Sequence, residues 1–368
     1  MGKILHNKPK SILIIRLSAI GDIVMASGVI PVLRKHFPEA SLDWLVQSEC
    51  AQLLQGHAGL RRTISWPRQT WQQLWSQGKL LELSRQFRSL VKELRSQEYD
   101  LVLDLQGLWK SAWLAWICKS GPKVGLDSRE GSKWVLDKVC RSSSGDRKMA
   151  SEYLHLLQEL GLHTQDFHLG LQSRSEDQIQ ARELLQAHGV QGEYTVFCPF
   201  STREQKLWPL QHWLVLAGLL QERVGLQMVI LGGPADREMA EYLQSKSSCR
   251  LVNLAGETNL IQSLALVKGA SLLIGVDTGL THMGIMSQTP SVALFGSTCP
   301  YLWTGRQDSV VLYQERDCSP CRRHPNCNGQ YQCMQDLSPE LVCQTAASLL
   351  PEGAFGAQQA EATRQVQG

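Results

Sequence analysis

The sequence predicts an α/β protein built from two doubly wound, mostly parallel sheets, and three observations support this. Short apolar runs typical of buried parallel strands alternate with segments of helical periodicity. The chain of 368 residues is long for one domain, so two domains of roughly 170 residues each are expected. Polar motifs follow several of the apolar runs, at the strand ends where doubly wound sheets bind ligands.

The first half of the chain begins with the apolar run Ser11-Ile-Leu-Ile-Ile15, which is typical of a buried strand. Pro38 ends the helix that follows, because proline cannot continue a helix. Strands are expected at 11–15, 42–46 and 101–105, helices from Gly21 to about Phe37 and from Leu80 to Ser96, and an aromatic, amide-rich loop at 66–75.

The same alternation resumes after residues 164–178, which show no strong period and therefore indicate a domain boundary. Strands are expected at 194–198, 227–231, 251–254, 271–275 and 291–295, and helices at 209–223, 236–246 and 260–268. We therefore predict domains at 1–170 and 171–350, followed by a flexible tail at 351–368 that is rich in Gly, Ala and Gln.

Charge is divided unevenly between the halves. Residues 1–170 contain 23 Lys and Arg against 16 Asp and Glu, a net of +7, whereas residues 171–368 contain 14 against 18, a net of −4. Either the first half meets an anionic partner, or the imbalance is only a solvated surface. The small net charge of +3 for the whole chain and the lack of a recognised nucleic-acid-binding motif argue against a nucleic-acid-binding protein.

Membrane insertion is not expected, because no segment approaches 18 uninterrupted apolar residues. Residues 1–10 carry charges but are followed by a predicted strand and not by a signal-type apolar core. We therefore predict a cytoplasmic protein, which would touch a membrane only peripherally.

The most informative motif is Gly275-Val-Asp-Thr-Gly-Leu-Thr-His282, which links a predicted strand to a short helix. The free amides and the dipole at a helix N-terminus favour negative charge, so this turn could hold a diphosphate. The alternative is that Asp277 or Thr278 simply caps the helix.

Three other strand-end loops carry candidate functional residues. After the first strand, Ser18 and Gly21 allow a tight turn, and Asp22 could act as a general base or merely stabilise the helix N-terminus. The loop 198–213 offers two hydroxyls, Ser201 and Thr202, and two cations, Arg203 and Lys206, which suits a phosphate or a basic surface loop. In the third loop, Asp236 could bind a ribose.

Four motifs in order resemble those of the ADP-heptose:lipopolysaccharide heptosyltransferases, glycosyltransferase family 9, over residues 11 to about 345. They are Ser-Ala-Ile-Gly-Asp22, Asp104-Leu-Gln-Gly-Leu-Trp-Lys110, Ser-Thr-Arg-Glu-Gln-Lys-Leu-Trp208 and Val276-Asp-Thr-Gly-Leu-Thr-His282. The resemblance implies the GT-B fold, in which two Rossmann-like domains face each other across a cleft. It also implies inverting, metal-independent transfer of heptose from ADP-heptose to the inner core (Kdo or the first heptose) of lipopolysaccharide, at the inner-membrane surface and without a cofactor.

The resemblance also implies roles for individual residues. Asp22 would be the catalytic base, and Lys110 and Arg129 would face an anionic acceptor of the Kdo-lipid A type. The residues that would bind or shape the donor site are Ser18, Gly21, Ser201, Thr202, Lys206, Asp236, Asp277, Thr278, Gly279 and His282.

The chain departs from the family pattern in two places. The segment 66–75 is aromatic and amide rich where some members are densely basic, and Cys318, Cys321, Cys327 and Cys333 form a C-x₂-C-x₅-C-x₅-C cluster. This cluster resembles that of type II members, whereas the 104–110 segment is more similar to type I. The four thiols could bind zinc or stay reduced and structural, since disulfides are disfavoured in the cytoplasm.

Two alternative functions remain open at this point. The chain could be a family member that uses another nucleotide sugar or a later core position, or a nucleotide-binding regulatory protein on a degenerate GT-B frame. The presence of Asp22, Lys206 and Asp277 argues against the second alternative.

Overall fold

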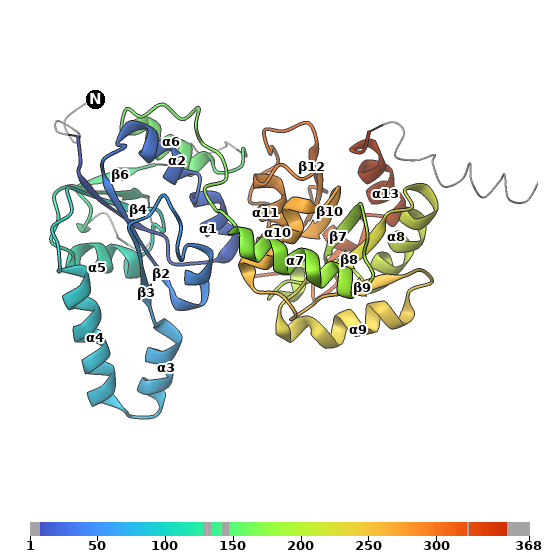
Figure 1. Cartoon of the computed structure of the whole chain (residues 1–368), viewed down its shortest axis with the longest axis horizontal. Helices are drawn as coiled ribbons and strands as arrows, with labels where there is room; N and C mark the ends of the chain where they lie inside the picture. Colours follow the sequence, from blue (N-terminus) through green and yellow to red (C-terminus); the bar gives the residue numbers. More distant parts are fainter. Residues whose placement is uncertain (1–7, 128–130, 132–133, 142–146, 322–323, 352–368) are drawn as a thin grey trace, which may run out of the picture. The chain divides into compact units, whose positions relative to one another are not determined.

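The computed structural model describes residues 8–127, 131, 134–141, 147–321 and 324–351, which fall into two compact units. Unit 1 comprises residues up to 146 together with 150–172, and unit 2 comprises 147–149 and everything from Ser173 onward. Each unit contains one six-stranded sheet whose strands all run parallel. Figure 1 shows both sheets with their helices.

Unit 1 alternates strands and helices along the chain. Its strands are β1 (Ser11–Ile15), β2 (Ser41–Gln47), β3 (Arg62–Trp66), β4 (Leu101–Asp104), β5 (Lys123–Leu126) and β6 (Lys138–Cys140). Its helices are α1 (Ile20–Ala26), α2 (Val29–His36), α3 (Arg68–Ser76), α4 (Leu80–Leu94), α5 (Trp109–Ile117) and α6 (Ser151–Glu159), with a 3₁₀ turn at Ser48–Leu53.

The sheet of unit 1 has the strand order β3-β2-β1-β4-β5-β6. The central strands β1 and β4 are almost completely buried, and a core of aliphatic and aromatic side chains lies between the sheet and helices α4 and α5. The strand order reverses between β1 and β4, and doubly wound sheets bind ligands at the carboxyl edge beside such a reversal.

Unit 2 follows the same alternation. Its strands are β7 (Tyr194–Cys198), β8 (Gln227–Ile230), β9 (Leu251–Asn253), β10 (Leu272–Val276), β11 (Ser291–Phe295) and β12 (Ser309–Tyr313). Its helices are α7 (Ser175–Ala187), α8 (Leu210–Arg223), α9 (Arg237–Lys246), α10 (Leu260–Gly269), α11 (Gly279–Met286), α12 (Gln332–Gln335) and α13 (Pro339–Ser348), with 3₁₀ turns at Glu204–Lys206 and Pro234–Asp236.

The sheet of unit 2 has the order β12-β11-β10-β7-β8-β9, so its reversal lies between β7 and β10. All five residues of each of these two strands are buried. Helices α8, α9 and α13 cover one face and enclose the largest part of the core of this unit. The prediction of two parallel α/β sheets is therefore confirmed.

The helix predicted from Gly21 to Phe37 is wrong in one respect, because two helices, α1 and α2, occupy this segment. Ser27 turns its hydroxyl back to the carbonyl of Val24 and accepts a hydrogen bond from the backbone N–H of Gly170. At Gly28, a side chain would overlap the ring of Phe167. Contacts with residues 167–170 therefore interrupt the helix, and the periodicity of the local sequence does not indicate these contacts.

The loop predicted at 66–75 is also wrong, because the segment forms the end of β3 and most of α3. Trp71, Leu74 and Trp75 stand at helical spacing, but three apolar positions in a short amide-rich segment were too few to indicate a helix, and none of the residues of α3 is fully buried. Helices α3 and α4 form a hairpin that projects from the rest of unit 1 (Figure 1). Among the described residues, no helix is both long and apolar enough to cross a membrane.

Candidate active site

The loops after β7 and β10 meet at the point where the strand order of unit 2 reverses. The loop after β7 contains Lys206, and β10 runs directly into Asp277. The Lys206 Nζ atom lies 2.7 Å from Oδ2 of Asp277, although the two residues are far apart in sequence. The pairing of β7 with β10 therefore brings the two loops together.

Asp277 is the centre of a buried polar cluster. Its Oδ1 atom lies 3.1 Å from His282 Nε2, and Thr298 donates its hydroxyl to Oδ2. Burial by itself raises the pKa of Asp277, but the hydrogen bond and charge of His282 and the charge of Lys206 outweigh it and hold the pKa well below its usual range. The carboxylate is therefore ionised and fixes the position of the Lys206 ammonium.

His282 connects this cluster to the loop after β11. Its Nδ1 atom lies 2.7 Å from the hydroxyl of Tyr301, which is completely buried. An ionised carboxylate only accepts hydrogen bonds, so His282 donates through Nε2–H to Asp277 and, when neutral, accepts from Tyr301 at Nδ1. Burial raises the pKa of Tyr301 far above its usual range, which keeps its hydroxyl protonated as a donor.

Helix α11 begins beside the Asp277 cluster and keeps its amino end open. Thr278 occupies the N-cap position with extended backbone angles, but its side chain makes no capping hydrogen bond. The carboxylate of Asp277 is directed to Lys206 and His282. Side-chain capping, the alternative interpretation of this motif, is therefore not observed, and the amides of the first turn of α11 are left without a side-chain acceptor, as an anion-binding helix N-terminus requires.

A close approach between backbone and side chains makes glycine necessary in β10. A Cβ atom at Gly275 would overlap the hydroxyl of Thr281 and the Cβ of Cys198 on the neighbouring strand. Thr281 uses that hydroxyl to donate to the carbonyl of Val276, at 2.7 Å. This packing sets the start of α11 close to the end of β10.

The remaining predicted donor residues of unit 2 lie at the same carboxyl edge of the sheet. Ser201 is half-buried and Thr202 exposed, and neither has a hydrogen-bond partner among the residues that the structure describes. Asp236 lies at the end of the loop after β8, where its carboxylate accepts the N–H of Gly233 at 2.8 Å. Both hydroxyls are therefore available to a ligand, whereas Asp236 also stabilises its own loop.

In unit 1, Asp22 lies in the first turn of α1, directly after β1. Its Oδ2 atom accepts the backbone N–H of Ala19 at 3.1 Å and lies 2.5 Å from Arg16 Nη2. Its Oδ1 atom has no partner among the described residues, and 39% of the side chain is exposed. Asp22 therefore stabilises the helix N-terminus, as the simpler alternative predicted, and still presents one free carboxylate oxygen.

Arg16 and Gln106 tie the loops after β1 and β4 together. Arg16 is buried at the end of β1 and donates to the carbonyl of Leu105 at 2.5 Å. The side-chain oxygen of Gln106 accepts the backbone N–H groups of Leu17 and Ser18, at 2.9 and 3.1 Å. The position of Asp22 and of the Ser18–Gly21 turn thus depends on the loop after β4.

Asp104, the last residue of β4, is completely buried and organises that second loop. It accepts hydrogen bonds from the hydroxyl of Ser111 at 2.9 Å and from the backbone N–H groups of Gln106 and Gly107. Burial raises the pKa of Asp104 to about 6, and these hydrogen bonds and the charge of Arg16 only partly oppose the shift.

This raised pKa predicts that Asp104 makes the protein less stable as pH rises. In the folded state the carboxyl keeps its proton over a pH range in which the unfolded chain has lost it. Its contribution to the free energy of unfolding is therefore complete below about pH 4 and is lost as the pH rises through about 6. We expect the free energy of unfolding to fall by about 3 kcal/mol from this group between pH 4 and pH 7. Urea denaturation of the wild type and Asp104→Asn across this range measures it, and an identical fall in both proteins would contradict the prediction.

The structure describes only one of the two residues that are predicted to bind the acceptor. Lys110 is half-buried in the first turn of α5, at the same carboxyl edge of the sheet as Asp22. Arg129 lies outside the described residues.

The four cysteines of the C-x₂-C-x₅-C-x₅-C cluster lie near the loop after β11. Cys321 directs its sulfur to the carbonyl of Ser297 at 3.9 Å, and a side chain at the preceding Gly296 would contact Cys333. All four are free thiols. Within the described part of the chain, no group of three or more His, Cys, Asp or Glu side chains is arranged to hold a metal ion. Zinc binding by the four thiols stays a prediction from their spacing.

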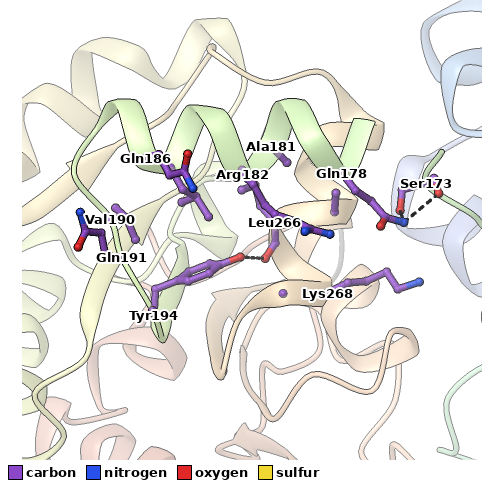
Figure 2. A pocket seen from close by; sticks show the side chains of 14 residues that line it. Ser173, Gln178, Ala181, Arg182, Gln186, Val190, Gln191, Tyr194, Leu266 and Lys268 are labelled. Atoms are coloured by element: carbon purple, nitrogen blue, oxygen red, sulfur yellow. Dashed lines mark hydrogen bonds between the residues drawn. The ribbon is translucent and has the colours of Figure 1, made fainter. Parts of the chain in front are cut away.

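A separate cavity of about 660 Å³ lies in unit 2 between α7, α10 and the beginning of β7. Figure 2 shows the lining residues Tyr194, which donates its hydroxyl to the carbonyl of Leu266, Arg182 and Lys268. Tyr194 begins β7 and Lys268 precedes β10, so the cavity lies at the amino edge of the sheet. It is therefore distinct from the candidate site at the carboxyl edge.

Sequence reasoning missed the residues that support the predicted ones, namely Arg16, Gln106, Thr298 and Tyr301. One signal was available for Arg16, since a cation at the end of the apolar run Ser11–Ile15 needs a partner. Thr298 and Tyr301 follow the apolar strand β11 and resemble any other polar loop.

Solved structures with the same architecture define the class of protein. The crystal structure of a glycosyl transferase family 9 protein from Veillonella parvula superposes with a TM-score of 0.77 at 24% identity, covering 92% of this chain and 97% of the other. Escherichia coli heptosyltransferase WaaC with ADP-2-deoxy-2-fluoro heptose has a TM-score of 0.68, also at 24% identity, covering 91% and 98%. The chain therefore has the GT-B fold.

The sequence comparisons lead from the class to the family. The family model Glycosyltransferase family 9 (heptosyltransferase) matches residues 87–332. Lipopolysaccharide heptosyltransferase 1 of Escherichia coli strain K12 is 27% identical over 301 residues, which are 80% of this chain and 90% of that protein. This protein belongs to glycosyltransferase family 9, the heptosyltransferases.

Proposed function

We propose that this protein is an inverting heptosyltransferase of lipopolysaccharide core biosynthesis that uses ADP-heptose as donor and an inner-core saccharide, Kdo or the first heptose, as acceptor. The observation that carries the proposal is the buried Asp277–Lys206–His282 cluster beside the uncapped start of α11. The family and the ADP-sugar held by WaaC support a nucleotide-activated heptose as the donor.

In this proposal the diphosphate of the donor binds at the N-terminus of α11. Thr278, Gly279 and the following amides donate hydrogen bonds, and Lys206 supplies a positive charge held in place by Asp277. The hydroxyls of Ser201 and Thr202 provide further donors. Asp236, at the end of the loop after β8, accepts from a hydroxyl of the ribose.

Asp22 acts as the general base. Its free Oδ1 atom takes the proton of the acceptor hydroxyl as that oxygen bonds to the anomeric carbon. The bond between this carbon and the diphosphate oxygen breaks at the same time, the configuration inverts, and ADP leaves with the electron pair. Lys206 and the α11 amides stabilise the departing charge, so the proposed step requires neither a metal ion nor a cofactor.

The acceptor binds to unit 1, and its phosphates meet the excess of basic residues there. Lys110, in the first turn of α5, is the proposed contact in the described part of the chain, and Arg129 is proposed from the family motif. Because the acceptor is an inner-core lipid, the protein works at the cytoplasmic face of the inner membrane as a peripheral protein. The net charge of +7 over residues 1–170 agrees with an anionic partner.

Profiling donors against truncated acceptors tests the proposal. We expect transfer from ADP-heptose, but not from UDP- or GDP-sugars, and a product whose mass increases by one heptose on Kdo-lipid A or on the acceptor that already carries one heptose. Transfer should persist in the presence of a metal chelator. Turnover with a different nucleotide sugar would support the family alternative, and binding of ADP-heptose without any turnover would support a regulatory protein.

A further inference from the structure

The α3–α4 hairpin of unit 1 combines a firmly packed base with an unsupported tip. At the base, ring contacts run from Trp66 to Trp71, Phe87 and Trp113, with centroid separations of 6.1, 5.9 and 5.8 Å. The buried residues of α4, Leu90 and Leu94, both lie near its C-terminus. The core therefore holds the hairpin only at its base.

The tip of the hairpin, residues 75–81, exposes three large apolar side chains. Trp75 is 69% exposed, Leu80 56% and Leu81 85%, on either side of a turn at Gly78. Isolated exposed apolar side chains are ordinary, but three of them gathered at the end of a projecting hairpin form a cluster of the kind that enters another apolar phase. Figure 1 shows the hairpin extending away from the body of unit 1.

The hairpin is also strongly basic. Residues 67–95 contain six Lys and Arg against two Glu, a net of +4. Arg85 pairs with Glu82 at 2.7 Å, whereas Lys79, Arg88 and Lys92 have no acidic partner in the part of the chain that the structure describes. A short apolar tip with cations within it and along the following helix fits a surface whose interior is apolar and whose headgroups are anionic.

We infer that the tip at residues 75–81 is the segment by which the protein docks on an anionic phospholipid bilayer. Trp75 and Leu81 enter the boundary between headgroups and acyl chains, and the cations along α4 remain in contact with the phosphates. The inference rests on the proposed function only in that the acceptor is a membrane lipid. It adds the segment that makes contact and the chemistry of the lipid that this segment selects.

Flotation of the whole protein with vesicles tests the inference. We expect binding to vesicles of phosphatidylglycerol and phosphatidylethanolamine, little binding to phosphatidylcholine alone, and weaker binding at high salt. The double variant Leu80→Ser/Leu81→Ser should lower binding to the anionic vesicles by about tenfold or more, because two apolar side chains no longer partition. Unchanged vesicle binding by this variant would overturn the inference.

Matched controls separate the tip from exposed apolar residues in general. Trp75→Ser should weaken vesicle binding, whereas Trp303→Ser, which alters a tryptophan of unit 2 with 71% exposure, should not. Ile179→Ser, at 52% exposure on α7, is the corresponding control for Leu80. Equal losses in all variants would mean that exposed apolar area, and not the tip, drives binding.

Two further measurements distinguish this inference from the proposed function. Leu80→Ser/Leu81→Ser should keep wild-type heptose transfer to a deacylated, water-soluble acceptor and lose transfer to the acceptor embedded in vesicles. Failure of transfer to both acceptors by the wild type would refute the proposed function and leave the vesicle result standing. Light scattering should give the same molecular mass in solution for the wild type and for Leu80→Ser/Leu81→Ser. A larger mass for the wild type would mean that the tip contacts a second copy of the chain, and it would overturn the inference.

Discussion

Replacing Asp22 with Asn is expected to lower kcat by about 10²–10⁴-fold, the range that a general base contributes. The amide can still accept the N–H of Ala19, so the start of α1 should persist, but it cannot take a proton from the acceptor. The dissociation constant for ADP-heptose should change little, because the proposed diphosphate contacts lie in unit 2. Initial rates together with donor binding by calorimetry measure both quantities.

The main alternative explanation for lost turnover is lost folding, because Asn removes the ion pair between the buried Arg16 and residue 22. Thermal unfolding of the variant addresses this directly. Asp100→Asn is a matched control, since Asp100 also accepts backbone N–H groups, those of Lys10 and Ser11, but lies at the amino edge of the same sheet. Substantial turnover by a folded Asp22→Asn protein would remove Asp22 as the base.

Replacing Lys206 with Ala is expected to weaken binding of ADP and ADP-heptose by roughly 10- to 100-fold. A hydrogen bond to a charged group contributes about 1.5–3 kcal/mol, and each 1.4 kcal/mol corresponds to a tenfold change in affinity. Asp277 keeps His282 and Thr298 as partners in this variant, so the turn into α11 should remain intact. Titration calorimetry with ADP measures the effect without requiring turnover.

Lys268→Ala is the matched control for Lys206→Ala. It removes another lysine of unit 2, but one that is exposed at the end of α10 and at the amino edge of the sheet. Its affinity for ADP should equal that of the wild type. If Lys206→Ala binds ADP as tightly as the wild type does, the diphosphate does not bind at the start of α11.

Much of the fold could be predicted from the sequence because the buried strands are continuous apolar runs. The runs Ser11–Ile15, Tyr194–Cys198 and Ser291–Phe295 coincide with β1, β7 and β11. The short strands β5 and β6, with four and three residues, were missed because a run of three or four residues is too short to show a distinctive period. Helix α3 was missed because it is stabilised by the aromatic contact between Trp71 and Phe87 and buries no residue in the core.

The sequence by itself determined which residues are candidates for chemistry. Asp22, Lys206 and Asp277 each follow an apolar strand, and parallel strands place such residues at one edge of their sheet. Four short motifs in the expected order also indicated the family, which the match over residues 87–332 then established. These conclusions depend only on local periodicity and on the order of motifs along the chain.

Only the tertiary structure decided how these residues are held. Lys206 pairs with Asp277 because β7 and β10 are neighbours, and Arg16 reaches Leu105 because β1 lies beside β4. Strand order is set by the packing of the whole sheet, so no local pattern encodes these contacts between distant segments. The same reason applies to the projecting hairpin, because only the folded structure shows that Trp75, Leu80 and Leu81 at its tip are exposed.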